Sequence, residues 1–196
     1  MRKVIVTMWI TLDGFIAGPN GEINWVTEIY DEEMGKYETD LVSAADTLLL
    51  GRKTYESFAG AWPKVPENPS ASTGEVEFAR KLNAMRKIVF SKTLEKVEWN
   101  NSRLVKDNIA EEVAKLKQGS GKDVIIYGSA SIVQTLMNLG FIDEYQLLVH
   151  PVVLGSGKPL FKNNKVRVNL KLVKTKTHSS GVVVLCYQPT RKEVKN

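Results

Sequence analysis

The order of apolar segments along the chain predicts an α/β fold, a mixed and mainly parallel sheet with helices on both faces. Short runs rich in β-branched residues alternate with longer segments whose apolar residues recur at helical spacing. The last two predicted strands flank a short turn and should form an antiparallel hairpin. Because strand–helix repeats bury a sheet between helical layers, we expect one domain over residues 1–190, followed by a basic tail at 191–196.

The first half of the chain should contribute three strands and three helices, separated by two loops. The strands are expected at Lys3–Ile10, Thr47–Leu50 and Lys87–Phe90. The helices are expected at Asp31–Ala45, Arg52–Phe58 and Val76–Met85. Turn signals such as Asp13-Gly14 predict that Leu12–Trp25 is mostly loop, and prolines predict a long loop at Trp62–Gly74.

The second half continues the alternation and then changes to strands alone. The expected helices are Ile109–Gln118 and Ser131–Leu139. The expected strands are Asp123–Tyr127, Glu144–Val149, Leu170–Lys176 and Val182–Gln188. The last two strands flank the turn at residues 178–181 and account for the predicted hairpin.

Composition excludes several classes of protein. The 196 residues are 43% apolar and 25% charged, which is typical of a globular chain and excludes disorder for most of its length. Cys186 is the only cysteine, so a disulfide scaffold is excluded, and its apolar neighbours indicate a buried, inert thiol. With only His150 and His178 as further ligands of the usual kind, we expect no zinc or iron–sulfur site.

The charge pattern favours neither nucleic acid nor a membrane as partner. The 27 Lys and Arg exceed the 22 Asp and Glu by five, and residues 165–196 are strongly basic. Apolar residues alternate with these charges and no aromatic residue does, so we expect a half-exposed strand with a solvated face. The longest uncharged run, Val124–Ile142, is too polar to span a bilayer. Since Val4–Leu12 reads as a strand rather than an export signal, we expect a cytoplasmic protein.

Three strand ends carry residues suited to binding phosphate. Gly51 ends one strand, and Arg52, Lys53 and Thr54 begin the following helix, where free backbone N–H groups favour an anion. A capped helix with two solvated cations would show the same pattern. Small residues at 128–131 follow another buried strand and suit a pyrophosphate at a helix N-terminus, although tight helix–sheet packing would also explain them. Ser91-Lys92 follows a third strand.

Taken together, these segments resemble the dihydrofolate reductase superfamily. The similarity is greatest to the reductase domain of riboflavin biosynthesis and its stand-alone relatives. It spans Lys3 to about Gln188. The matching segments are Trp9–Ala17 (WITLDGFIA), Gly51–Ser57 (GRKTYES), Lys87–Lys92 (KIVFSK), Asp123–Ile132 (DVIIYGSASI), Gly140–Tyr145 (GFIDEY) and Pro151–Phe161 (PVVLGSGKPLF).

The resemblance implies a dihydrofolate-reductase-like sheet that binds NADPH across the carboxyl ends of its strands. It assigns the adenosine 2′-phosphate and pyrophosphate side to Gly51, Arg52, Lys53 and Thr54, and the adenosine flank to Ser91 and Lys92. It assigns the pyrophosphate cradle to Gly128, Ser129, Ala130, Ser131 and Ile132, and the nicotinamide lining to Ile16 and Ala17. Riboflavin-type reductases usually have two glycines where this chain has Gly128-Ser129.

The resemblance also implies an activity, an NADPH-dependent reduction of a small, flat heterocycle. The favoured type is 5-amino-6-(5-phosphoribosylamino)uracil reductase. The alternatives are a dihydrofolate or pterin reductase and a catalytically silent NADPH-binding protein. Folate-type enzymes hold the pterin with a carboxylate soon after a tryptophan, and this chain has no clear match near Tyr30. We expect a homodimer, with the C-terminal strands as its interface.

Four residues are candidates for catalysis or substrate binding. Asp13 matches the riboflavin-type pattern and could orient a pyrimidine or supply the proton, or it could form an Asx turn with Gly14. Glu28 could supply the proton or simply lie at a helix N-terminus. Trp62 could cover a flat ring or anchor its loop in the core, and Trp25 lies at the end of the first loop, beside the substrate in this interpretation.

Overall fold

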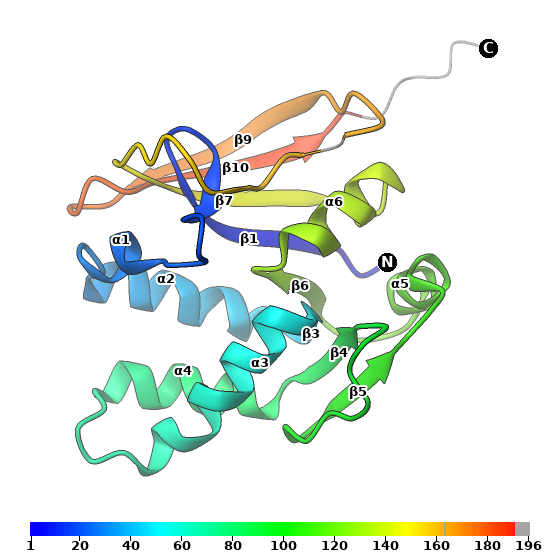
Figure 1. Ribbon diagram of the computed structural model, residues 1–196, viewed down its shortest axis with the longest axis horizontal. Coiled ribbons are helices and arrows are strands. Elements are labelled where there is room, and N and C mark those ends of the chain that lie inside the picture. The colour runs from blue at the N-terminus through cyan, green and yellow to red at the C-terminus, as the bar shows by residue number, and fades with distance from the viewer. Residues whose placement is uncertain (163, 191–196) are drawn as a thin grey trace.

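The computed structural model describes residues 1–162 and 164–190, and it confirms the predicted α/β fold. Within these residues eight strands form one sheet in the order β5-β4-β3-β6-β1-β7-β10-β9. The six strands from β5 to β7 are parallel, and β10 and β9 add an antiparallel pair (Figure 1). The strands are β1 (Val4–Thr11), β3 (Ala45–Gly51), β4 (Arg86–Phe90), β5 (Ser102–Val105), β6 (Asp123–Tyr127), β7 (Glu144–His150), β9 (Leu170–Thr177) and β10 (Val183–Pro189).

Helices cover both faces of this sheet, as predicted. The helices are α1 (Asn24–Thr27), α2 (Glu32–Ser43), α3 (Arg52–Ala61), α4 (Thr73–Ala84), α5 (Ile109–Gln118) and α6 (Ala130–Asn138). On one face Val4 and Val6 of β1 pack in a core with α5 and α6. On the other face Leu48 and Leu50 of β3 pack in a second core with α2, α3 and α4. Alternate residues of a strand point to opposite faces of the sheet, and here both faces are covered by helices. The strands are therefore apolar at nearly every position, and these continuous apolar runs are what predicted them from the sequence.

The helix starts follow from local capping. Asp31 precedes α2, and its carboxylate accepts a hydrogen bond from the Met34 N–H at 2.8 Å. Ser72 and Glu75 form a capping box at the start of α4. This box begins α4 three residues before the predicted start at Val76.

The two predicted loops contain short elements that the sequence did not indicate. Residues 12–25 include β2 (Phe15–Ala17), which pairs with β8 (Lys158–Pro159) in a separate two-stranded sheet, and the beginning of α1. The proline-rich loop begins with a 3₁₀ helix, η1 (Trp62–Glu67). Strand β5 was also missed, because it is short, partly exposed and lies at the edge of the sheet. Elements of two to six residues carry too little periodicity to be recognised and depend on their tertiary neighbours.

The C-terminal hairpin is confirmed, but its edge strand is more exposed than predicted. Nearly every residue of β9 is exposed, including Leu170, Leu172 and Val173, instead of only one face. The reason is that β9 ends the sheet beyond β10, and its side-chain contact with helix α2 comes from Lys176 near its end, which pairs with Glu33 and lies over Tyr37. Cys186 on β10 is buried, as predicted, with 5% of its surface exposed. The tail predicted at 191–196 lies outside the described residues.

None of the helices formed by residues 1–162 and 164–190 combines the length and the apolar character that a bilayer crossing requires.

Candidate functional site

A pocket of about 560 Å³ opens at the carboxyl ends of the parallel strands. Its walls include the last residues of β3 and β6 and the middle of β1, together with the first turns of α3 and α6. Ligands of open α/β sheets bind at this edge, where the connections to helices leave a crevice. The volume is typical of a small-molecule site.

Two strand-to-helix turns form one side of the pocket. In the first, Gly51 is the N-cap of α3, and in the second, Gly128 and Ser129 precede α6. Both helices present N–H groups without intrahelical partners, which favour an anion. Gly128 has a φ of +67°, and a Cβ added there would lie 3.1 Å from the Thr54 methyl carbon. Both the left-handed φ and this tight contact favour glycine where the two turns meet.

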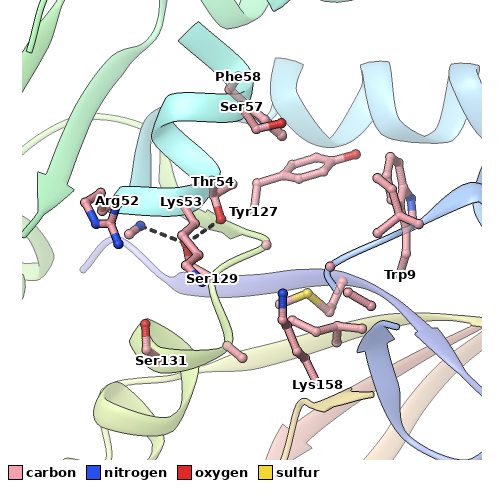
Figure 2. Close-up of a pocket in the computed structure, with 18 of the residues that line it drawn as sticks. Trp9, Arg52, Lys53, Thr54, Ser57, Phe58, Tyr127, Ser129, Ser131 and Lys158 are labelled. Atoms are coloured by element: carbon pink, nitrogen blue, oxygen red, sulfur yellow. Dashed lines mark hydrogen bonds between the residues drawn. The ribbon is translucent and has the colours of Figure 1, made fainter. Parts of the chain in front are cut away.

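The Ser129 side chain joins these two turns. Its hydroxyl oxygen accepts a hydrogen bond from the Gly51 N–H at 2.7 Å, and the same hydroxyl donates to Thr54 Oγ1 at 2.8 Å (Figure 2). Ser129 adopts a left-handed conformation with a φ of +63°, which is unfavourable for a residue with a Cβ. The two hydrogen bonds of the hydroxyl offset the energetic cost of this conformation. They also hold the turn at Gly51 and the turn at Gly128-Ser129 in a fixed position relative to each other.

The pocket is positively charged. Its charged lining residues are Arg52, Lys53 and Lys158, and no Asp or Glu of the described chain lines it. Arg52 contacts Glu56 on the same helix at 3.3 Å, with both side chains more than two-fifths exposed. An exposed pair of this kind contributes at most about 1 kcal/mol, so the Arg52 guanidinium is free to turn toward an anionic ligand.

Aromatic side chains and a buried carboxylate close the other end of the pocket. Trp9 and Tyr127 line it and both donate hydrogen bonds to Glu38 behind them, Trp9 Nε1 at 2.6 Å from Glu38 Oε1. Tyr30 donates to the second carboxylate oxygen at 2.8 Å. Glu38 is 2% exposed, and this burial raises its pKa, while the hydrogen bonds from the two tyrosines and the tryptophan oppose the rise. The network fixes the orientation of the Trp9 and Tyr127 rings.

The structure brings most of the predicted cofactor residues around this pocket. Those that line it are Ile16, Ala17, Gly51, Arg52, Lys53, Thr54, Gly128, Ser129, Ala130 and Ser131.

Ser91, Lys92 and Ile132 lie outside the pocket lining. The Ser91 hydroxyl accepts hydrogen bonds from the N–H groups of the turn that follows it, and Lys92 forms an exposed ion pair with Asp107. Ile132 belongs to the apolar core between α6 and the sheet. A strand end brings a residue to the correct edge of the sheet, but the direction of its side chain depends on the following turn.

The two predicted proton donors also lie outside the pocket lining. Asp13 is exposed, and its carboxylate accepts hydrogen bonds from the Gly155 N–H at 2.7 Å and the Leu154 N–H at 3.3 Å. A hydrogen bond from the Thr11 hydroxyl, with these backbone bonds, lowers the pKa of Asp13, which makes it a poor acid at neutral pH. The geometry thus gives Asp13 a role in holding a loop. Glu28 is exposed and accepts a hydrogen bond from the Asn24 side chain, and it follows the end of α1, so the alternative that placed it at a helix N-terminus was wrong.

Of the two tryptophans predicted to contact substrate, Trp25 is buried and Trp62 is half-buried, and neither lines the pocket. Trp25 is 5% exposed and lies edge-on to His150, with ring centroids 4.9 Å apart. Trp62 packs against Phe78 at a centroid distance of 4.9 Å and anchors the 3₁₀ helix. This favours the interpretation of Trp62 as a core anchor, because neither ring lines the pocket.

Trp9, Tyr127, Lys158 and the buried Glu38 were not singled out from the sequence. Trp9 and Tyr127 stood inside matching segments, and Tyr127 immediately precedes Gly128, which was selected. Glu38 stands four residues after Met34 and four before Val42, on the buried face of α2, so its place in the apolar stripe was a signal of burial that the sequence reasoning did not use. Lys158 stands in a loop segment, and only the pairing of β8 with β2 turns it into the pocket.

Comparisons with known proteins give a consistent result. The profile of the RibD C-terminal domain family matches residues 2–184. The uncharacterized protein YyaP of Bacillus subtilis is 46% identical over 187 residues, covering 95% of this chain and 94% of YyaP. The riboflavin biosynthesis protein RibD of Corynebacterium ammoniagenes is 25% identical over 170 residues, which are 80% of this chain and 46% of that protein. The crystal structure of a protein from Shewanella sp. PV-4, described as a riboflavin biosynthesis protein, superposes with a TM-score of 0.75 at 20% identity, covering 97% of this chain and all of the other.

Proposed function

This chain belongs to the RibD C-terminal domain family, a family of reductase-type oxidoreductases, and on that premise we propose that it is an NADPH-dependent reductase of a small, flat heterocycle. The favoured substrate is a ribosylaminopyrimidine of the kind reduced in riboflavin biosynthesis. The observation that carries the proposal is the pair of strand-to-helix turns joined by the Ser129 hydroxyl, in a pocket that the described residues line with cations and without an acid.

The residues of this pocket fit a dinucleotide with an additional phosphate. Gly128 lets the turn before α6 lie against Thr54, so the starts of α3 and α6 can offer their N–H groups to one pyrophosphate. Arg52 and Lys53 stand at the start of α3, where a guanidinium can bind a 2′-phosphate through two parallel hydrogen bonds. When bound, NADPH supplies the hydride.

The remaining lining residues would position the substrate. Ile16 and Ala17 offer an apolar surface for the nicotinamide ring, and Trp9, Phe58 and Tyr127 offer flat aromatic surfaces for a heterocycle. Excluding water between these surfaces would align the two rings for hydride transfer.

The absence of a pocket carboxylate among the described residues favours a pyrimidine over a pterin. The buried acid behind the pocket is Glu38, and it accepts hydrogen bonds from Trp9, Tyr30 and Tyr127. The Trp9 and Tyr127 side chains line the pocket and separate Glu38 from it. A pterin held in the folate manner needs a carboxylate that accepts hydrogen bonds from the ring, and Glu38 is buried and does not reach the pocket surface.

Calorimetric titration with NADPH and NADH, on the wild type and on Arg52→Ala, tests the cofactor assignment. Loss of one charge-assisted phosphate contact should cost about 1.5–3 kcal/mol in NADPH binding. The loss in NADH binding should be small, since NADH lacks the 2′-phosphate. Arg80→Ala is the matched control, because Arg80 is an exposed arginine on α4 that lines no part of the pocket. Failure of the wild type to bind either nucleotide would refute the proposal.

We also propose that two copies of the chain associate through the C-terminal strands. Strand β9 is the sheet edge and exposes Leu170, Leu172 and Val173, and unpaired edge backbone groups can hydrogen-bond to a second copy. Light scattering at micromolar protein should give the mass of a dimer, and Val173→Lys should shift it toward the monomer. A monomeric mass for the wild type would contradict this assembly.

A further inference from the structure

Lys158 brings a charged amine into the pocket without a partner. It lies on β8, where it pairs with Ala17 of β2. Within residues 1–162 and 164–190, its side chain makes neither a hydrogen bond nor an ion pair, although it is only partly exposed. The other pocket cations are carried by α3, and Figure 2 shows the Lys158 amine entering the pocket from the opposite side.

Two glycines create the position of this amine. Gly157 has a φ of +155°, and a Cβ there would lie 2.3 Å from the Ala17 carbonyl oxygen, so glycine is needed for β8 to pack against β2. Gly21 has a φ of +98°, and a Cβ there would lie 2.6 Å from Lys158 Nζ. The amine therefore occupies the space that a side chain at position 21 would take, over the loop that leads to α1.

The surroundings of the amine make it a strong site for an anion. Met8, Ile16 and Ile23 line the same pocket, and their side chains provide no acceptor for an ammonium group. An ion pair gains more in such partly desolvated surroundings than in water, and an unpaired ammonium is correspondingly unfavourable there. An anionic ligand group would supply the missing acceptor.

The phosphates of a dinucleotide have their own cradle on the far side of the pocket. Gly128 and Ser129 with the start of α3 form that cradle, whereas Lys158 lies beside Ala17, at the end assigned to the reacting ring. We propose that Lys158 forms a second anion subsite, which binds an acidic group, phosphate or carboxylate, on the substrate itself. This inference rests on the proposed function for the distinction between substrate and cofactor.

Titration with three pyrimidines tests the subsite. Uridine 5′-monophosphate carries a phosphate, orotate carries a carboxylate, and uridine carries neither. Each is titrated into the wild type, Lys158→Gln, Lys158→Arg and the control Lys162→Gln, with and without NADPH. Lys162 is an exposed lysine four residues further on and does not line the pocket.

We expect the wild type to bind at least one of the two anions about tenfold or more tightly than uridine, as a charge-assisted contact requires. Lys158→Gln should abolish this preference, while Lys158→Arg and Lys162→Gln should keep it. Which anion is preferred identifies the acidic group. Affinity for uridine and NADPH should change less than about threefold in Lys158→Gln, since neither ligand uses this amine.

Three results would overturn the inference. They are a wild type without preference for either anion, a Lys158→Gln variant that keeps the preference, and a Lys158→Gln variant whose NADPH affinity falls as much as its anion affinity. Failure of the proposed function can be distinguished from failure of this inference. If the wild type does not bind NADPH, the titrations without nucleotide still measure whether anion binding depends on Lys158. An anion preference that depends on Lys158 under those conditions supports the subsite alone.

Discussion

Replacement of Ser129 tests the idea that its hydroxyl joins the turn at Gly51 to the turn at Gly128. Ser129→Ala removes the acceptor of the Gly51 N–H and the donor to Thr54, while the left-handed backbone at φ +63° keeps a Cβ. Ser129→Gly removes the same two hydrogen bonds and also relieves the backbone of that Cβ. The two variants therefore separate the hydrogen bonds from the conformational cost.

The expected magnitudes follow from the two contributions. A net hydrogen bond is worth about 1 kcal/mol, and a buried N–H left without an acceptor costs about 1–3 kcal/mol, so Ser129→Ala should lower the free energy of unfolding by about 2–4 kcal/mol. A left-handed conformation costs a residue with a Cβ about 1–2 kcal/mol relative to glycine. Ser129→Gly should therefore be more stable than Ser129→Ala by about 1 kcal/mol, yet less stable than the wild type.

Urea unfolding of the three proteins measures these differences, and NADPH titration measures the effect on the site. Both variants should bind NADPH more weakly than the wild type, because the turns at Gly51 and Gly128 are no longer tied together. A Ser129→Ala variant as stable as the wild type, or more stable than Ser129→Gly, would refute the reasoning.

Three further predictions concern the pocket and the core. Gly128→Ala should lose about 1–3 kcal/mol of stability and most of its NADPH affinity, because the new Cβ is strained at φ +67° and meets Thr54; normal urea unfolding of this variant would contradict the close approach. Burial raises the pKa of Glu38 above 4.5, the value of an exposed glutamate. In urea unfolding, the stability of the wild type relative to Glu38→Gln should therefore fall as the pH rises above about 4.5, and a stability difference that does not change with pH would contradict the raised pKa. Burial lowers the pKa of Lys87 to about 8, so the stability of the wild type relative to Lys87→Met should rise between pH 8 and about 10.5, and a flat difference in chemical denaturation over that range would count against it.

The strands and helices of the central sheet could be predicted because their periodicity is local. Strand Asp123–Tyr127 was located to the residue, and the first strand was located to within one residue at each end. The elements that were missed, β2, α1, η1, β5 and β8, are too short to show a period. Strands β2 and β8 exist only because they pair with each other across more than 140 residues of sequence.

For the site, too, local features could be predicted from the sequence and features that depend on distant segments could not. The turns at Gly51 and Gly128 could be found because a small residue after a buried strand and before a helix is visible in the sequence, and parallel strands place such turns at one edge. The direction of individual side chains was not predictable. Asp13 points to the backbone of residues 154–155 and Trp25 into the core, because distant segments supply their partners.

The sequence by itself determined the fold class, the family and the two glycine turns, since these depend on patterns within a few neighbouring residues. Only the tertiary structure decided that the Ser129 hydroxyl joins the turns, that Glu38 is buried behind Trp9, and that Lys158 enters the pocket. The physical reason is that hydrogen bonds and charges act across space. Their partners lie from 29 to more than 70 positions apart in the chain, and only folding brings them within reach.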